Sequence, residues 1–202
     1  MAIKTEKVGH FSIFLQSDIE SLKILSNFCM SHIKSLNFSI NLDHSFFMKT
    51  FTYLQYEDCH QKLGNGTFGY SKLCKSKKNQ EKYVIKVLFT NQADDFAPRY
   101  TERISKLVHP CICHICSYNT FNHDINLLLP YFENGNLTSA IQADIKHKPP
   151  KWWDTTCKMK AMYGIAVGMA YLHSENVFHR NLTTNNILFD NNYEIKISDI
   201  GC

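Results

Sequence analysis

The sequence predicts an α+β protein in which a β-rich part is followed by a helical part. Between residues 53 and 89, apolar and β-branched runs alternate with glycine-rich or polar turns, which is typical of consecutive antiparallel strands. Residues 154–175 carry apolar side chains at helical spacing. A length of 202 residues with 44% hydrophobic and 20% charged content allows one good-sized domain with an extension.

The composition argues against nucleic-acid and membrane partners. The formal net charge is only +4, and the one local basic cluster, at Lys72, Lys75, Lys77 and Lys78, is interpreted as a solvated hairpin tip. We find no apolar run of membrane-spanning length and no apolar signal core at the N-terminus. We therefore expect a cytoplasmic or nuclear protein whose eight cysteines are reduced.

Residues 1–55 are predicted to form an N-terminal helical extension. Ser17 and Glu20 have the spacing of a capping box, and an amphipathic helix is expected over 18–36. The residues of its apolar face are Ile19, Leu22, Leu25 or Phe28, Cys29, Ile33 and Leu36. This helix either packs on the following domain, which we favour, or docks a partner protein.

From Tyr53 the pattern is strand, glycine turn, strand, polar turn and strand, with the third strand over 83–89 interrupted by Lys86. A helix is expected over 95–107, because His109-Pro110 ends it. Two more strands are expected over 112–118 and 125–131.

The helical part begins after a turn at 133–136, with a short helix from Leu137. The long helix over 154–175 is expected to have one apolar face, formed by Met159, Met162, Ile165, Ala166, Met169 and Leu172. Two short strands, 187–189 and 195–197, are expected around an Asn-Asn turn.

One cysteine-rich stretch raises the question of a metal site. Cys111, Cys113, His114 and Cys116 lie close together in the sequence, but structural zinc sites usually pair two such knuckles across a spacer. The alternation of cysteine and isoleucine equally fits a buried strand, and we favour the strand.

The glycine motif at Gly64, Gly66 and Gly69 lies between two predicted strands. Glycine lets the backbone approach a phosphate closely. A dinucleotide-binding motif of this kind opens a helix, whereas here a strand follows, and Lys86 comes seventeen residues after Gly69. A lysine inside an apolar strand needs a partner, and we expect phosphate contact for Lys86.

Two further motifs follow in the last third of the chain. The loop "FHRNLTTNN" contains His179, Arg180, Asn181 and Asn186, and "SDIG" follows with Asp199. In order and spacing, the four motifs resemble those of a eukaryotic protein kinase domain, from about Tyr56 to the last residue. The stretch "YGIAVGMAYLHSENVFHRN" is similar to the tyrosine-kinase-like group.

The resemblance implies ATP and Mg²⁺ as cofactors. It implies that the glycines cover the phosphates, that Lys86 holds the α- and β-phosphates, and that Asn186 and Asp199 hold Mg²⁺. The residues that it places around ATP are Leu63, Gly64, Gly66, Gly69, Lys86, the gatekeeper Leu129, and Pro130 and Phe132 through their backbone.

The chain departs from the family pattern at several positions. Asn181 occupies the position of the catalytic Asp, and an amide cannot accept a proton. Thr183 replaces the lysine of serine/threonine kinases, and Ile200 replaces the phenylalanine of D-F-G while staying apolar. Ser71 stands where a valine usually packs on adenine.

The glutamate that pairs with the strand lysine is also missing from its usual position. That position is Tyr100 in this sequence, and Glu102 lies about 200° further around a helix. We therefore expect Glu102 to face away from Lys86.

The resemblance divides residues 56–202 into a complete N-lobe, 56–132, and a partial C-lobe, 133–202, because the chain stops directly after Asp-Ile-Gly. We expect a partner protein to cover the helix over 154–175 or to bind the N-terminal helix. Three interpretations stay open: an ATP-binding pseudokinase, which we favour; an active kinase whose sequence is incomplete; and an interaction module that binds no nucleotide.

Overall fold

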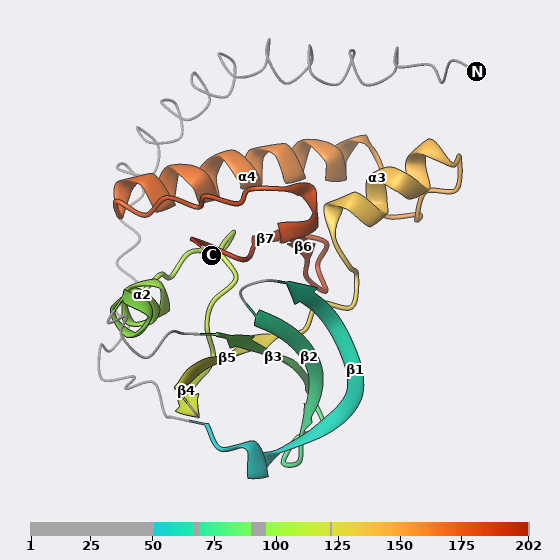
Figure 1. Ribbon diagram of the computed structural model, residues 1–202. Coiled ribbons are helices and arrows are strands. Elements are labelled where there is room, and N and C mark those ends of the chain that lie inside the picture. The colour runs from blue at the N-terminus through green and yellow to red at the C-terminus, as the bar shows by residue number, and fades with distance from the viewer. Residues whose placement is uncertain (1–50, 67–68, 90–95, 122, 202) are drawn as a thin grey trace, which may run out of the picture.

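The computed structural model describes residues 51–66, 69–89, 96–121 and 123–201. A twisted antiparallel sheet forms one half, and helices with a short hairpin form the other (Figure 1). The sheet order is β1-β2-β3-β5-β4. Its strands are β1 (Tyr56–Gly66), β2 (Gly69–Ser76), β3 (Lys82–Leu88), β4 (Ser117–Phe121) and β5 (Asp124–Pro130). This is the expected α+β architecture, in which a β-rich part is followed by a helical part.

The sheet separates two hydrophobic clusters, because side chains alternate between the faces of a strand. Ile85 and Val87 of β3 pack on one face with Phe51, Cys74 and Leu128. A short 3-10 helix, η1 (Tyr53–Gln55), leads into β1 beside this cluster. Since Lys86 lies between Ile85 and Val87, its side chain points to the opposite face, toward the helical half.

The strand predicted over 112–118 is wrong in its position. Only Ser117 and Tyr118 of that range belong to β4, which continues to Phe121. Residues 111–113 bond to the C-terminal hairpin: Cys113 N donates to Ile197 O at 2.9 Å, and Ile197 N donates to Cys111 O at 2.8 Å, whereas bonding to the sheet begins at Cys116, whose N donates to Leu128 O at 2.9 Å. The segment with alternating cysteines and isoleucines therefore connects the helical half to the sheet.

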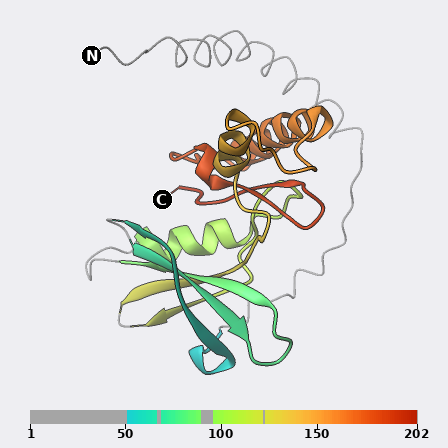
Figure 2. The same cartoon turned by 90° about the vertical axis from the view of Figure 1, so that its right-hand side faces the viewer.

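Three α-helices are described, and Figure 2 shows α2 between the sheet and the helical half. They are α2 (Phe96–Ser105), α3 (Leu137–Ile145) and α4 (Thr155–Ser174). Side-chain caps begin the last two helices: Asn136 accepts a hydrogen bond from Ser139 N, and Asp154 accepts one from Cys157 N. No helix in the described part of the chain is long and apolar enough to cross a membrane.

The predicted apolar face of α4 is only partly correct. Leu172 is fully buried, but Met159 and Met162 are 62% and 51% exposed. The face that packs on the hairpin carries small residues instead, above all Gly164 and Gly168. Small side chains let the helix approach the hairpin closely, and periodicity alone does not separate such a face from the face with larger apolar residues.

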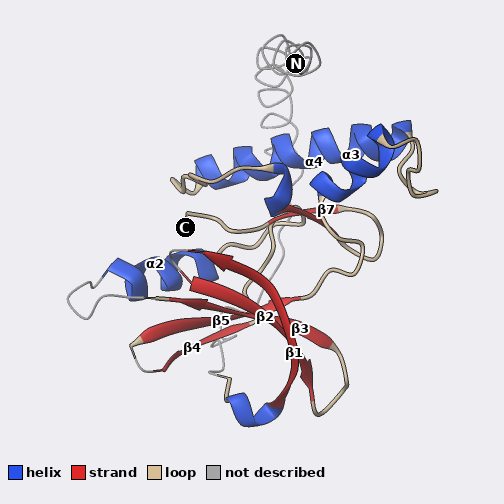
Figure 3. Cartoon of the chain, turned by 45° about the vertical axis from the view of Figure 1, so that its right-hand side comes forward, coloured by secondary structure: helices blue, strands red, loops and turns tan. Residues whose placement is uncertain are grey.

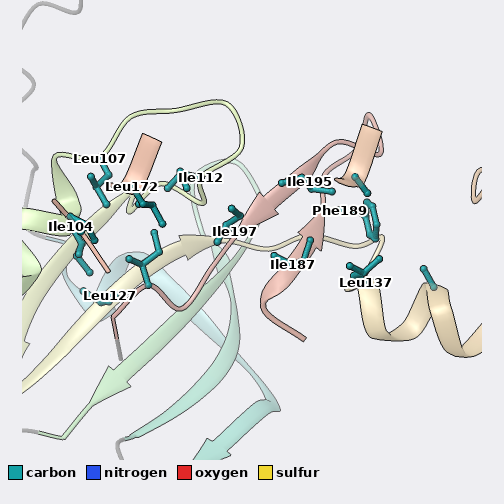
Figure 4. Packing of buried hydrophobic residues seen from close by; sticks show 14 of the residues in the cluster. Ile104, Leu107, Ile112, Leu127, Leu137, Leu172, Ile187, Phe189, Ile195 and Ile197 are labelled. Carbon is teal, nitrogen blue, oxygen red and sulfur yellow. The ribbon is translucent and has the colours of Figure 1, made fainter. Parts of the chain in front are cut away.

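The C-terminal hairpin fills the space between α4 and the sheet (Figure 3). It pairs β6 (Ile187–Phe189) with β7 (Ile195–Ile197), as the sequence predicts, and a one-turn 3-10 helix, η2 (Thr184–Asn186), precedes it. Figure 4 shows the cluster that joins both halves. Its labelled members are Ile104, Leu107, Ile112, Leu127, Leu137, Leu172, Ile187, Phe189, Ile195 and Ile197.

The helix expected over 18–36 lies outside the described residues. The basic cluster is not a hairpin tip as a whole, because Lys72 and Lys75 lie within β2. Lys72 pairs with Asp58 across the β1–β2 ladder at 2.7 Å, so that half of the cluster forms part of the sheet surface.

Candidate nucleotide site

Lys86 is the central charged residue where the two halves meet. Its Nζ donates a hydrogen bond to Asp199 Oδ1 at 2.8 Å, and its side chain is only 14% exposed. A lysine this buried is stable when an anion accompanies it. The structure thus brings together two residues that are 113 positions apart and that the sequence assigned to phosphate and metal binding.

The backbone around Asp199 is held in an uncommon conformation. Asp199 has φ of 58°, in the left-handed region that residues other than glycine rarely adopt. Hydrogen bonds on both sides maintain it: His179 Nε2 lies 2.9 Å from Ser198 O, and Gly201 N donates to His179 O at 2.8 Å. Strained backbone of this kind clusters at ligand and catalytic sites.

The loop at 179–186 is joined to the Asp199 loop through Asn186. Both the backbone N and the hydroxyl of Ser198 donate to Asn186 O, at 2.8 and 3.1 Å. The amide Nδ2 of Asn186 donates to Asn181 O at 2.8 Å, which leaves the amide oxygen as the atom suited to a metal. The side chain of Asn186 is thereby fixed close to the segment that carries Asp199.

Asn181 is exposed, as a residue that meets a substrate must be. Its backbone N donates to His179 Nδ1 at 3.3 Å, and its carbonyl accepts the bond from Asn186. Its backbone therefore holds the loop in shape, but its side chain is a neutral amide. Such a group can orient a hydroxyl and cannot remove its proton.

The three glycines of the β1–β2 turn differ in their surroundings. A Cβ on Gly69 would lie 1.8 Å from Val87 O, so close packing of β2 on β3 requires glycine there. A Cβ on Gly64 would meet nothing within 4 Å, and one on Gly66 would reach only Gly69 O at 4.0 Å. Packing does not explain these two glycines, whereas close approach of a phosphate does.

A pocket opens behind Leu129, between the sheet, α2 and the Asp199 loop. Lys86, Ser198 and Asp199 supply its polar lining, and the rest is apolar. The apolar lining residues are Ile104, Cys113, Ile115, Leu127, Leu129 and Ile200. Ile200 is 7% exposed, which agrees with the expectation that it packs as an apolar residue.

The remaining residues assigned to ATP lie outside that pocket lining. Leu63 lies in β1 and is 38% exposed. Pro130 ends β5 opposite Tyr83, and Phe132 follows it in the connection to α3. Proline has no N–H, so Pro130 can offer only a carbonyl, and Phe132 O already accepts from Gly135 N at 3.3 Å. Their roles toward adenine stay predictions.

The usual glutamate partner of the strand lysine has no substitute at Glu102. Glu102 is exposed and pairs with Lys106 at 2.8 Å one turn later in the chain, as expected from its helical phase. Tyr100 lies in α2, but its side chain is outside the described residues. In the described structure, Lys86 forms an ion pair with Asp199.

Burial sets the charge states beside the pocket. It lowers the pKa of His179, although the bond to Ser198 O opposes the shift, so this ring is neutral at physiological pH. Burial also raises the pKa of the Cys113 thiol to about 12, with the neighbouring Cys116 and Asp199 acting in the same direction. Cys113 is therefore a neutral, apolar lining residue and not a nucleophile.

No sequence pattern indicated the residues that anchor α2 to α4. Arg103 donates to Glu175 O and Asn176 O at 3.0 and 2.8 Å, beyond the last turn of α4. The hydroxyl of Tyr171 accepts from Val108 N at 2.9 Å, and its ring stacks on His109 at 4.9 Å. Only the His109-Pro110 pair was a visible signal, and it was used to end a helix.

The donor set fits a hard divalent cation shared with a phosphate ligand. Asp199 offers a carboxylate and Asn186 an amide oxygen, and such cations complete their coordination with water and phosphate oxygens. By contrast, the described residues contain no group of three or more His, Cys, Asp or Glu placed to hold a metal ion. Cys111, Cys113, His114 and Cys116 accordingly form no metal cluster.

Comparisons with known proteins agree with this geometry. A family model described as "Protein kinase domain" matches residues 57–202. The chain is 32% identical over 144 residues to the discoidin domain-containing receptor tyrosine kinase B of Caenorhabditis elegans, an alignment covering 71% of this chain and 17% of that protein. It is 31% identical over 144 residues to the Aurora/IPL1-related protein kinase 2 of the same organism, with coverages of 69% and 45%.

A third relative is the dual specificity testis-specific protein kinase 2 of Homo sapiens. The identity is 28% over 146 residues, covering 70% of this chain and 24% of the relative. The chain thus spans less than half the length of each of these three proteins.

Proposed function

The chain belongs to the protein kinase domain family, and on that premise we propose that it binds ATP with Mg²⁺ and transfers phosphate weakly or not at all. A protein kinase domain uses ATP and a divalent metal. The observation that carries the proposal is the contrast within one site. Lys86 and Asp199 are paired at 2.8 Å beside a rigidly held Asn186, whereas the position of the base is the amide Asn181.

The charges of the site support binding of ATP and Mg²⁺. In the described structure, the ammonium of Lys86 is buried against Asp199 and faces the pocket, where it can take the oxygens of an α- or β-phosphate. Asp199 and Asn186 would hold the metal, which neutralises phosphate charge when bound. The open space around Gly64 and Gly66 lets the β1–β2 turn approach the phosphates.

Asn181 and Thr183 support the proposed weak or absent phosphate transfer. A positioned base contributes about 10²- to 10⁴-fold in rate, and an amide at that position cannot supply it. Thr183 brings no positive charge toward the γ-phosphate, where a serine/threonine kinase has a lysine. Both changes remove stabilisation of the transferring phosphoryl group, and neither removes a residue assigned to ATP binding.

We assign the chain to the tyrosine-kinase-like group on its 163–181 sequence, and to the cytoplasm on its composition. A protein partner is proposed to cover the exposed apolar residues of α4.

The test is a thermal-shift titration with Mg²⁺ and ATP. Nucleotide at tenfold its Kd stabilises by about 1.4 kcal/mol, which raises Tm by roughly 3–6 °C for a chain of this size. Lys86→Met removes the buried ammonium and is expected to abolish the shift. Lys82→Met is the matched control, because Lys82 lies on the same strand, is exposed and pairs with Glu133.

The outcomes separate the alternatives. No shift in the unaltered chain at millimolar nucleotide would rule out the binding half and favour an interaction module. An equal shift in the Lys86→Met protein would contradict the role of Lys86. The Tm of each variant without nucleotide shows whether it is folded, so a lost shift is not mistaken for a lost fold.

A further inference from the structure

Positive charge is concentrated in residues 146–160. The segment contains five lysines and one aspartate, a formal net charge of +4, which equals the formal net charge of the whole chain. It connects α3 to the first turns of α4, and α3 lies on the side of the helical half opposite α2 and the C-terminus (Figure 1 and Figure 3). Because acidic and basic residues balance in the rest of the chain, this segment is where an anionic partner is attracted.

Three exposed lysines follow the last residue of α3. Lys146, Lys148 and Lys151 form no ion pair in the part of the chain that the structure describes. Ile145, directly before them, is 70% exposed. These four residues are called here the loop surface, because all of them except Ile145 lie in the connection between α3 and α4.

Neighbouring carboxylates do not neutralise the loop surface. Asp144 is bound to Lys158 at 2.6 Å, which joins α3 to α4. Asp154 caps α4 by accepting a hydrogen bond from Cys157 N at 2.7 Å. Glu194, in the turn between β6 and β7, has no described ion pair with a lysine of this segment. The three ammonium groups of the loop surface therefore face solvent without a described counter-charge.

The backbone that carries these lysines is fixed by aromatic packing. The ring of Trp152 stacks on that of Tyr193, with centroids 4.9 Å apart and an interplanar angle of 13°. Trp153 is 7% exposed, and its ring lies edge-on to that of Phe189 with centroids 5.6 Å apart. The N of Trp153 also donates to Pro150 O at 2.9 Å. A preformed surface loses little conformational freedom when it binds a partner, which favours binding.

The other group of lysines, in and after β2, is balanced by acidic residues. Lys75 lies opposite Glu57 in the β1–β2 ladder, and Glu81 follows Lys77 and Lys78 in the same turn. Opposite charges across a ladder attract one another. The loop surface has no such balance and is carried on a fixed backbone, which indicates a surface for an anionic partner more than a solvated turn.

We propose that the loop surface binds an acidic segment of another protein, whose carboxylates pair with the three lysines while an apolar side chain contacts Ile145. Single-stranded nucleic acid is usually held by free aromatic faces, and a membrane surface by several apolar side chains. Here both tryptophans are used in packing, and Ile145 is the one exposed large apolar residue in the described stretch between residues 137 and 158. A protein segment that offers carboxylates and one apolar group fits this surface better than either alternative.

The test measures binding of a labelled peptide to the 202-residue chain by fluorescence anisotropy at physiological ionic strength. The probe is a short glutamate peptide that contains one leucine. Lys146→Gln with Lys148→Gln and Lys151→Gln is expected to weaken its binding by about tenfold or more, since each exposed lysine–carboxylate pair contributes roughly two- to fivefold.

The matched control is Lys75→Gln with Lys77→Gln and Lys78→Gln, which removes the same charge from the other lysine group. This triple variant is expected to leave the Kd of the peptide unchanged. An equal loss of binding in both triple variants would mean that only the net charge of the chain matters, and would contradict the proposed loop surface. The Tm of each variant shows that it is folded.

Two further probes, phosphatidylserine vesicles and oligothymidylate, test the class of partner. Both are expected to bind the unaltered chain more weakly than the peptide when compared per anionic group. Tighter binding of either probe, lost when the three loop lysines are replaced, would assign the surface to a membrane or a nucleic acid and overturn the proposal. No binding of any of the three probes would show that the loop surface is only solvated, and would overturn it as well.

Ile145→Ser tests the apolar contact separately. A second peptide, with glutamine in place of the leucine, is expected to bind severalfold more weakly to the unaltered chain, and the two peptides are expected to bind the Ile145→Ser protein equally. Equal binding of both peptides to the unaltered chain would contradict the apolar contact. The loop surface lies outside the lining of the nucleotide pocket, so all of these variants are expected to keep the thermal shift with ATP, and peptide binding is tested independently of nucleotide binding.

Discussion

Gly168→Ala adds one methyl group where α4 crosses β7, and the structure predicts its cost. The new Cβ would lie 2.7 Å from Ile197 Cδ1 and 3.2 Å from Cys111 Cβ. Overpacking of this size costs about 1–3 kcal/mol, while alanine gains about 1 kcal/mol over glycine inside a helix. The free energy of unfolding is therefore expected to fall by about 1 kcal/mol.

The assay is equilibrium unfolding in urea, followed by the fluorescence of Trp152 and Trp153 near the start of α4. Ile197→Val removes Cδ1, the atom nearest to the new methyl group, so the double variant is expected to lose less stability than the sum of the two single variants, by about 1 kcal/mol. Strictly additive effects, or a more stable Gly168→Ala protein, would refute the close packing of α4 on β7.

Three further predictions concern other residues. The hydroxyl of Thr101 is fully buried and has no hydrogen-bond partner in the described structure, so Thr101→Val should stabilise the fold by about 1 kcal/mol in urea unfolding, and a loss would reveal a hidden partner. Burial lowers the pKa of His109 and His179, so the unfolded chain takes up protons first as the pH falls. Stability should therefore decrease below about pH 6.5, by at most about 1.4 kcal/mol per pH unit for each histidine, and a Tm constant from pH 7.5 to 5.5 would contradict this. Asn181→Asp should raise ATP hydrolysis by about 10²-fold or more while Asn181→Ser does not, and equal rates in a phosphate-release assay would remove Asn181 from the position of the base.

Local patterns predicted the strands and turns of the β-rich half well. Alternation and turn residues placed β1, β2 and β3, and Asn136 and Asp154 occupy the caps of α3 and α4. These features depend on neighbouring residues in the chain. The same applies to the four motifs, whose spacing identified the family before any contact was known.

Features that depend on distant residues were missed or misplaced. A strand was expected over 112–118, but the backbone of Cys113 bonds to Ile197, far away in sequence, and β4 begins only at Ser117. The predicted apolar face of α4 included the exposed Met159 and Met162, because the sequence does not show that Gly164 and Gly168 face a hairpin. The Arg103 bonds to the end of α4 likewise involve backbone carbonyls, which no side-chain pattern reveals.

The candidate site was predictable in composition but not in geometry. Lys86, Asn186 and Asp199 were named from motifs, whereas the direct Lys86–Asp199 pair and the Ser198 bonds to Asn186 became visible only in the fold. A pair of residues 113 positions apart leaves no local signal. Helical phase predicted that Glu102 faces away from Lys86, and in the described structure Glu102 pairs with Lys106.

The most direct test of the account follows bound nucleotide and its γ-phosphate in one experiment. The chain, in excess over its Kd, is mixed with Mg²⁺ and γ-labelled ATP, and bound label and released or transferred phosphate are measured over hours. We predict stoichiometric binding that depends on Lys86, with intact ATP recovered. Phosphate turnover near the 1–100 s⁻¹ typical of kinases, or no bound label, would contradict the account.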